Sequence, residues 1–466
     1  MSVQPLSTGR AAPFVRTAVT RKPPATDIAV LMWILAPAGA IAGLLFAVGA
    51  TWPAAAVAGT AFAVSVFICP AVGLYAYFAW QAVDSAFISD TGSVLTPAKV
   101  FAPFLLLVYV CKFGRTGTRM LVSKPFIMAM LAYAAYGAVL APLSPEPSGA
   151  WRYTGQILVQ ALLVAMAVHV VNNRAFVGRA MVFTVIGGVI AAIIMSVSGH
   201  DIGSADQRAT IGEHANPNST AFALSIALFA IPAAWGYVRF KVMWPIYLAA
   251  APLIFWQVLQ TGSRTGMVGV FAAASLGVLI VKRTSITKRI VVATICTMIC
   301  VGVLAYQLGT GALAGRAGAR IESFVVAGDE DVSDNPRMAI WSLALQTFVR
   351  QPWGFGFGQT APTLRDEHGW FIDIHSSWLG ALVEGGVIGF TIFAWGMWHL
   401  LKATRGIARA HPGIAAAMML CLLALNGVAH TYTYSKWFWV PATLCLLMAE
   451  QAARDRAAEA MGAAQA

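Results

Sequence analysis

Charged side chains are scarce in this sequence. They make up 11% of its 466 residues, whereas hydrophobic residues make up 59% and a soluble domain carries roughly 25% charged residues. The mean hydropathy is +0.72. One core cannot bury so many apolar side chains, so the composition excludes an ordinary soluble domain and predicts an integral membrane protein.

Cysteine and metal-binding patterns are equally sparse. The six cysteines are scattered through apolar runs, so we expect neither a disulfide framework nor a zinc site. HExxH, P-loop and dinucleotide fingerprints are absent from the sequence. Asp329-Glu330-Asp331 resembles the DxD signature of nucleotide-sugar transferases, but we place it on the outer face, where such donors are absent. Asp84 and Asp90 are a weaker candidate for an acidic site. We predict no metal and no cofactor.

The sequence contains many long apolar runs and few charged residues. A helix needs about 20 mostly apolar residues to cross a bilayer, because its backbone must satisfy its own hydrogen bonds in lipid. The second and third runs are short and meet at Cys69-Pro70, so we expect 12 to 14 spans. The predicted fold is all-α, a polytopic membrane helix bundle. Its candidate spans are residues 28–49, 53–69, 70–83, 97–111, 125–142, 154–172, 177–197, 217–238, 242–259, 265–281, 289–308, 376–401, 413–430 and 435–450.

Basic residues predict the orientation of the bundle. With 14 spans, most of the 31 lysines and arginines fall on one side and most of the 19 acidic residues on the other. The positive-inside rule makes the basic side cytoplasmic and places both termini there. The net charge of +12 therefore reflects topology, and we expect no nucleic-acid partner. The predicted parts are a cytoplasmic tail (1–27), the first part of the bundle (28–308), a large periplasmic loop (309–375), the last spans (376–450) and a second cytoplasmic tail (451–466).

The periplasmic loop 309–375 is the longest predicted soluble stretch, and loops of this length are usually functional. It contains a helical segment. Asp334 or Asn335 can cap this helix, Pro336 suits its first position, and Pro352 ends it. We predict that this short helix lies on the membrane surface over the bundle. The run GFGFG at 354–358 follows it, and we predict that this run is a flexible hinge of the outer loop and no phosphate-binding loop.

Two predicted outer positions carry arginines close to glycine-rich or asparagine-rich turns. Arg208 precedes the run Asn216-Pro217-Asn218, where either asparagine can cap the next helix; a solvated loop arginine is the simpler interpretation of Arg208. Arg264 lies between small residues in QTGSRTGMVG. It can snorkel to lipid headgroups, or its guanidinium can bind phosphate with two parallel hydrogen bonds. We favour phosphate binding for Arg264.

A third position joins a histidine to a glycine-rich apolar run, HSSWLGALVEGGVIG. We expect His375 in the first turn of a spanning helix. A neutral imidazole at that position can accept a proton, so we interpret His375 as a general base. Glu384 follows in the same helix. An unpaired carboxylate there is unfavourable, so we expect it to bond a neighbour or a buried arginine.

Taken in order, these motifs resemble the O-antigen ligase and Wzy-type polymerase superfamily of bacterial envelope enzymes. The matching pieces are Arg208 followed by GEHANPN, then GSRTG, then NPRMAIW leading to PWGFGFGQ, and finally HSSWLGALVEGGVIG. The resemblance covers roughly residues 200–400. Each motif is weak alone, but four in this order on one predicted face are more specific.

The resemblance implies a fold and an activity. Family members have a GT-C-type helix bundle with a large outer loop. They transfer a glycan from undecaprenyl pyrophosphate, on the periplasmic face of the bacterial inner membrane, to a sugar hydroxyl of lipid A–core or of another repeat unit. The resemblance implies that His375 is the essential histidine and that Arg208 and Arg264 bind the pyrophosphate. Arg337 matches an RxxxW element, and Asn218 and Glu384 are possible substrate-binding residues. The expected reaction inverts the anomeric centre without a metal.

Two other functions remain open from the sequence. A Wzy-type polymerase needs the same donor site as a ligase and differs only in its acceptor. A transporter or flippase of lipid-linked glycan belongs to a different class, which favours inverted repeats and broken helices near the mid-membrane. The polar residues here cluster at one predicted face, which favours an enzyme.

Overall fold

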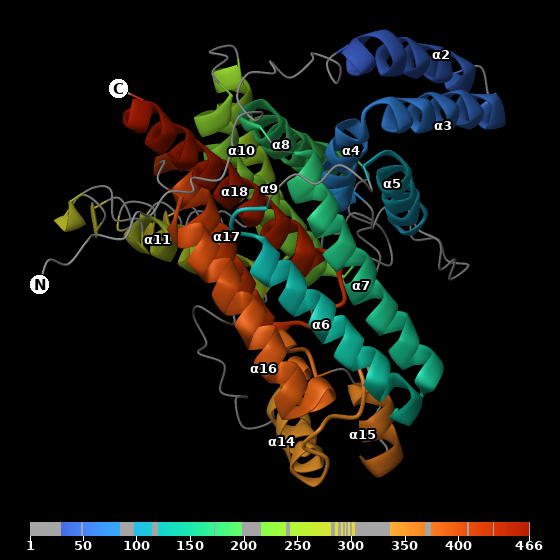
Figure 1. Ribbon diagram of the computed structural model, residues 1–466, viewed down its shortest axis with the longest axis vertical. Coiled ribbons are helices and arrows are strands. Elements are labelled where there is room, and N and C mark those ends of the chain that lie inside the picture. The colour runs from blue at the N-terminus through green and yellow to red at the C-terminus, as the bar shows by residue number, and fades with distance from the viewer. Residues whose placement is uncertain are drawn as a thin grey trace, which may run out of the picture. The chain divides into compact units, whose positions relative to one another are not determined.

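The computed structural model describes most of the chain. The described residues are 29–47, 50–83, 97–113, 120–171, 173–197, 216–238, 243–280, 336–368, 374–407, 410–431 and 433–465, with a few separate positions between 285 and 302. All regular elements in this part of the chain are helices (Figure 1). By its internal contacts the chain divides into two units, Met1–Val72 and Gly73–Ala466.

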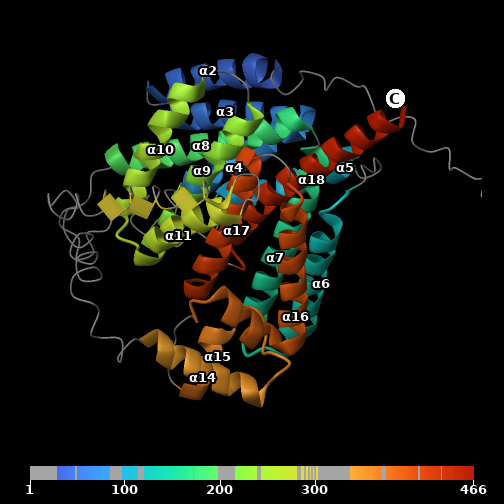
Figure 2. The same ribbon diagram turned by 90° about the vertical axis from the view of Figure 1, so that its left-hand side faces the viewer.

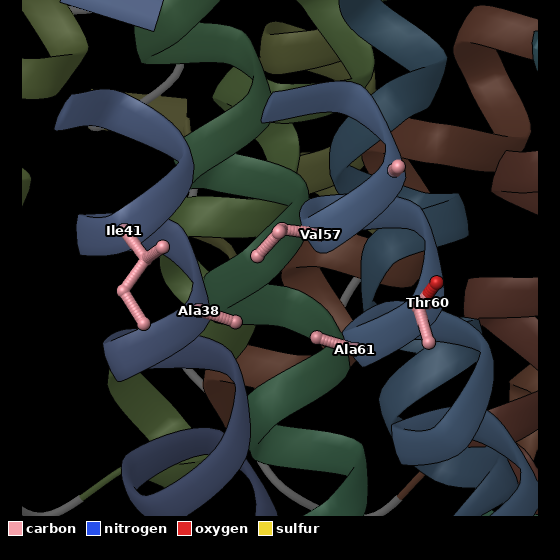
Figure 3. Close-up of a pocket in the computed structure, with 6 residues that line it drawn as sticks. Ala38, Ile41, Val57, Thr60 and Ala61 are labelled. Atoms are coloured by element: carbon pink, nitrogen blue, oxygen red, sulfur yellow. The ribbon is translucent and has the colours of Figure 1, made fainter. Parts of the chain in front are cut away.

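The first unit is a pair of apolar helices. A π-helical turn, η1 (Leu31–Leu35), leads into α2 (Ala36–Ala47), which packs against α3 (Thr51–Ile68). Small side chains let the two helices approach closely and leave a shallow groove between them. Figure 3 shows this groove, in which Thr60 is the one polar side chain among alanine, valine and isoleucine neighbours.

The second unit contains the remaining helices, except for the first three residues of α4, which belong to the first unit. Those of its first half are α4 (Pro70–Val83), α5 (Pro97–Phe113), α6 (Lys124–Leu140), the 3-10 turn η3 (Ala141–Leu143), α7 (Pro147–Val170), α8 (Arg174–Val197), α9 (Pro217–Tyr237), α10 (Met243–Gln260) and α11 (Arg264–Ile280). Those of its second half are α14 (Pro336–Arg350), α15 (Thr360–His368), α16 (Ser377–Arg405), α17 (Ala410–Ala429) and α18 (Lys436–Gln465).

The predicted all-α membrane fold is confirmed. Six helical segments of the described residues are long and apolar enough to cross a membrane: Lys124–Leu143, Pro147–Val170, Arg174–Val197, Pro217–Tyr237, Ser377–Arg405 and His411–Val428. Most of the other predicted spans coincide with shorter helices. The span predicted at 289–308 lies mainly outside the described residues, and the range of 12 to 14 spans stays a prediction.

Helices α11 and α17 run antiparallel in close contact. A Cβ atom at Gly269 would lie 2.5 Å from Asn426 Nδ2, and one at Gly277 would lie 2.5 Å from Met418 Cγ. The two glycines are eight residues apart, so they lie on one face of α11. Their lack of side chains lets the backbones approach, and the N-terminus of α11 therefore lies beside the C-terminus of α17.

Helices α6 and α16 form a second antiparallel pair, in which a Cβ atom at Gly389 would lie 3.3 Å from the Tyr136 ring. The short helices α14 and α15 pack against the N-terminal part of α16, as both Figure 1 and Figure 2 show. The helix predicted after Pro336 is confirmed as α14, and it ends at Arg350, just before Pro352. We call this end of the second unit, where α16 begins, the His375 end.

Candidate active site

His375 has a strained backbone. Its φ angle is +49°, and among the described residues it is the one non-glycine residue with positive φ. This conformation is unfavourable by roughly 1–2 kcal/mol for a residue with a Cβ atom, and such strain persists only where the surroundings enforce it. The helix α16 begins at Ser377 with Ser376 as its N-cap. The expectation that His375 lies in the first turn was therefore wrong: it lies one residue before the cap.

Trp341 of α14 fixes the backbone on one side of His375. Its indole Nε1 donates a hydrogen bond of 2.8 Å to the carbonyl of Ile374. The Ile374 side chain is 1% exposed and packs in a small core with Phe355 and Val383. The last residue of the predicted RxxxW element therefore acts on the histidine through the peptide that precedes it.

Helix α17 fixes the backbone on the other side. The Ser376 hydroxyl accepts a hydrogen bond from the Leu379 amide at 3.3 Å and donates one to the Gly427 carbonyl at 3.4 Å. The Ser377 hydroxyl donates to the carbonyl of His430 at 2.7 Å. The two serines after the histidine, which the sequence shows only as small polar residues, thus tie the start of α16 to the end of α17.

A conservative change at Trp341 should separate positioning from packing. Trp341→Phe keeps an aromatic ring but removes the donor to Ile374, an interaction worth about 1 kcal/mol. We expect turnover to fall by several-fold to about tenfold, because His375 loses part of its support, with little change in melting temperature in detergent. Ser342→Ala is the control, since that hydroxyl bonds to Ala339 within its own helix. Unchanged turnover in Trp341→Phe would remove the positioning role.

The asparagine and arginine motifs are joined by one serine. Ser263 caps α11, accepting a hydrogen bond from the Gly266 amide at 2.9 Å, and its hydroxyl donates to Asn218 Oδ1 at 2.6 Å. Asn216 caps α9, accepting from the Asn218 amide at 2.9 Å, so the capping interpretation of this asparagine is correct. Arg264 is the first residue of α11. The structure thereby brings the turn before α9 next to the turn that carries Arg264.

Helix α17 also connects these turns to His375. Asn426 of α17 contacts Gly269 of α11, five residues after Arg264, and the next residue, Gly427, accepts the hydrogen bond from Ser376. The N-termini of α11 and α16 therefore both lie beside the C-terminal part of α17, and the N-terminus of α9 lies beside that of α11. The side chains of Arg264 and Arg337 lie outside the described residues, as do all of Arg208, Asp84, Asp90 and the Asp329-Glu330-Asp331 run.

Glu384 is buried, at 1% exposure, in the first half of α16. Its carboxylate accepts hydrogen bonds from the Gly358 amide at 2.8 Å, the Thr360 hydroxyl at 2.7 Å and the Thr360 amide at 3.2 Å. Three donors offset the desolvation of a buried carboxylate. We expected Glu384 to bond either a neighbour or a buried arginine. The structure provides neighbouring donors, which belong to the loop that follows α14.

That loop, residues 351–359, packs into a break in α16. Gly386 has a φ angle of +64° within the helix. The Val387 amide beyond it donates to the Pro352 carbonyl at 2.9 Å, and the Gly356 amide donates to the Glu384 carbonyl at 3.1 Å. The sequence predicted a flexible hinge at GFGFG. The structure shows a packed loop instead, with Phe357 fully buried.

Three alternating glycines make this packing possible. Gly354, Gly356 and Gly358 have φ angles of +92°, +105° and +70°, and a Cβ atom at any of them would collide with Glu384, Ser144 or Tyr153, respectively. Only glycine combines this conformation with so close an approach. The loop therefore holds the break in α16 against the bundle, in the same helix that begins just after His375.

A polar cavity of about 420 Å³ opens beside this loop. No sequence pattern reveals it, because its walls come from the start of α7, the loop after α14, the start of α15, α16 and the turn before α18, which are far apart in the chain. Arg152 and Gln156 are single polar residues on a mostly apolar helix, and spacing alone gives them no signal. The lining residues are Glu146, Gly149, Arg152, Tyr153, Gln156, Gly358, Gln359, Ala361, Pro362, Glu384, Thr431, Tyr434 and Ser435.

The apolar helices and the site at the start of α16 define the class, a multi-pass helical membrane protein with its candidate site at one end of the bundle. Residues 248–394 match the family model described as O-Antigen ligase, which confirms the resemblance. The matched region includes Arg264, Arg337, His375 and Glu384, whereas Arg208 and Asn218 precede it. No curated protein matches the chain.

Proposed function

We propose that this protein is a glycosyltransferase of the O-antigen ligase type, which moves a glycan from undecaprenyl pyrophosphate to a sugar hydroxyl. The observation that carries the proposal is the strained His375, held between Trp341 and α17 at the end of the bundle where α11 begins with Arg264. A histidine kept in an unfavourable conformation by several elements is typical of a functional residue.

In the proposed reaction, the His375 imidazole accepts the proton of the acceptor hydroxyl as its oxygen attacks the anomeric carbon. The bond from that carbon to the pyrophosphate oxygen breaks, and undecaprenyl pyrophosphate leaves. Attack opposite the leaving group inverts the anomeric centre. General-base catalysis of this kind contributes roughly 10²–10⁴-fold. The guanidinium groups of Arg264 and Arg208 stabilise the charge that develops on the pyrophosphate, and Arg337 is a further contact to the donor.

The proposed location is the bacterial inner membrane, with the His375 end facing the periplasm and both termini in the cytoplasm. The positions of basic residues support this orientation. Lys124 begins α6 and Arg405 ends α16, so in this antiparallel pair the cations lie away from the His375 end. Basic residues favour the cytoplasmic ends of spans. A reporter enzyme that works only in the cytoplasm should be active when it is fused after Gln465. Activity of a fused reporter that works only in the periplasm would contradict this orientation.

Transfer should not need a metal ion. Arginines can take the charge of a pyrophosphate leaving group, so we expect turnover of the purified protein to stay within about twofold after treatment with EDTA. The measurement is glycan transfer before and after chelation, with re-addition of Mg²⁺ as the control. Loss of activity that Mg²⁺ restores would contradict this mechanism and would favour the acidic pairs Asp84/Asp90 or Asp329/Asp331.

The acceptor decides between a ligase and a polymerase. In the assay, the purified protein is given a polyprenyl-pyrophosphate glycan as the donor. The acceptor is either lipid A–core or a second lipid-linked repeat unit. Growth of lipid A–core by one glycan supports the ligase, whereas a ladder of repeat units assigns the Wzy-type polymerase. If the donor is consumed with neither acceptor, while the protein remains folded, the transferase proposal fails.

A further inference from the structure

The cavity beside Glu384 is lined by polar side chains and two tyrosines. We propose that it binds a sugar residue of the glycan chain next to the one that reacts, an inference that rests on the proposed function. Its volume of about 420 Å³ falls within the roughly 300–1,000 Å³ of small-ligand sites. Pyranose rings present hydroxyl groups around a partly apolar ring, so they need both donors or acceptors and an aromatic surface.

The aromatic surface comes from two tyrosines. The rings of Tyr153 and Tyr434 lie 4.8 Å apart between centroids, tilted by 49°, and the Arg152 guanidinium lies 4.8 Å from the centre of the Tyr153 ring. Stacking on tyrosine restricts the guanidinium, which lines the cavity. This arrangement offers an apolar face together with fixed donors.

Further polar groups line the same cavity. Gln359 is fully buried and its Oε1 accepts a hydrogen bond from the Glu146 amide at 2.9 Å, but its Nε2 has no hydrogen-bond partner in the described part of the chain. A buried amide donor without a partner is unfavourable. A ligand hydroxyl that accepts from Nε2 would remove this cost. Gln156 of α7 adds a second amide to the lining.

The glutamates of the cavity already have protein partners. Glu384 accepts from the loop amides described above, and Glu146 forms an ion pair of 3.1 Å with Arg365. Arg152 is therefore the cation available to a ligand in this lining. By contrast, the groove of the first unit in Figure 3 has one hydroxyl among apolar side chains and suits an acyl chain rather than a sugar.

The cavity shares a wall with the support of His375. Thr431 lines the cavity, and it follows His430, whose carbonyl accepts the Ser377 hydroxyl. A Cβ atom at Gly380 would touch both Thr431 Cγ2 at 3.8 Å and Ile374 Cγ2 at 3.5 Å. A glycan whose terminal sugar reacts at His375 would therefore extend past Thr431 into the cavity.

The test combines kinetics with direct binding. In the double variant Arg152→Ala/Gln156→Ala, we expect the KM for one glycan substrate to rise at least tenfold. If the KM rises when the acceptor concentration is varied at saturating donor, the bound sugar belongs to the acceptor. If the KM rises when the donor concentration is varied, the bound sugar belongs to the donor. Arg350→Ala is the control, because this exposed arginine of α14 does not line the cavity, and its KM values should stay within twofold of the wild type.

Binding is measured separately from transfer. Free repeat-unit oligosaccharide, released from the cell's own surface polysaccharide, would be added to the intact protein in detergent, with saturation-transfer NMR as the readout. We expect signal with the wild type and with Arg350→Ala, and at least a tenfold weaker Kd for the double variant. If the double variant binds and turns over like the wild type, the sugar site is excluded while the transferase function stands. If the wild type fails to transfer, the proposed function fails, and the NMR comparison alone decides whether the cavity binds sugar.

Discussion

Replacing His375 with alanine should lower glycan transfer by about 10²–10⁴-fold, the contribution of a positioned general base. The protein should still insert and fold, because the histidine side chain is only half-buried and its neighbours Ile374 and Ser376 keep their hydrogen bonds. The measurement is the rate of transfer from a lipid-linked glycan at saturating acceptor, together with the melting temperature in detergent. Normal transfer in this variant would remove the general-base assignment.

The positive φ angle of His375 provides a sharper control. His375→Asn retains a residue that tolerates this conformation, and His375→Gly removes the strain altogether. Both lack the imidazole, so we expect both to be as inactive as the alanine variant although each folds at least as well. Added imidazole should partly restore transfer in His375→Gly, where the space is largest. If glycine or asparagine alone restores activity, the backbone conformation is what the enzyme needs, and the base must be another group.

The second large effect is expected at Arg264. Arg264→Lys should lose nearly as much activity as Arg264→Ala, by about 10²-fold or more, because lysine retains the charge but lacks the planar fork that binds two phosphate oxygens. The measurement is kcat/KM for the pyrophosphate-linked donor. Arg350→Lys is the matched control, since this arginine is exposed and only 3.8 Å from Glu367 in a surface ion pair, and exposed pairs contribute little.

The contrasting outcome is equally informative. Full activity in Arg264→Lys would show that the site requires a positive charge and no fork. Full activity in Arg264→Ala would remove the pyrophosphate assignment altogether. Because Ser263 caps α11 and bonds Asn218, Ser263→Ala is a useful companion. It should weaken donor turnover less than either Arg264 variant if its role is only to orient the start of the helix.

Local signals predicted much of the fold. Apolar runs predicted the helices because the requirement for backbone hydrogen bonding in lipid acts on each segment separately. The bounds of α14 followed from Pro336 and Pro352, whose effects on helix ends are also local. The capping role of Asn216 was one of two interpretations that the sequence allowed, and the contact that gives Asn218 its partner, Ser263, lies 45 residues away.

The features that sequence analysis missed depend on segments that meet only in three dimensions. The GFGFG loop was predicted to be flexible because its glycines are permissive in isolation. Its order comes from the break at Gly386 and from the Glu384 carboxylate, which no periodicity reveals. The backbone strain at His375 depends likewise on Trp341 and α17. Arg152 and Gln156 line a cavity that exists only because the turn at 433–435 packs against α7.

Helix α17 touches the supports of both proposed reactive groups. Through Gly427 it holds the serine that follows the base, and through Asn426 it abuts the helix that begins with the proposed phosphate ligand. If α17 tilts, both groups move in the same direction. The distance between them therefore changes little during thermal motion of the bundle. Changes that loosen one contact of α17 and leave the other intact should therefore be more damaging than shifts of the whole helix.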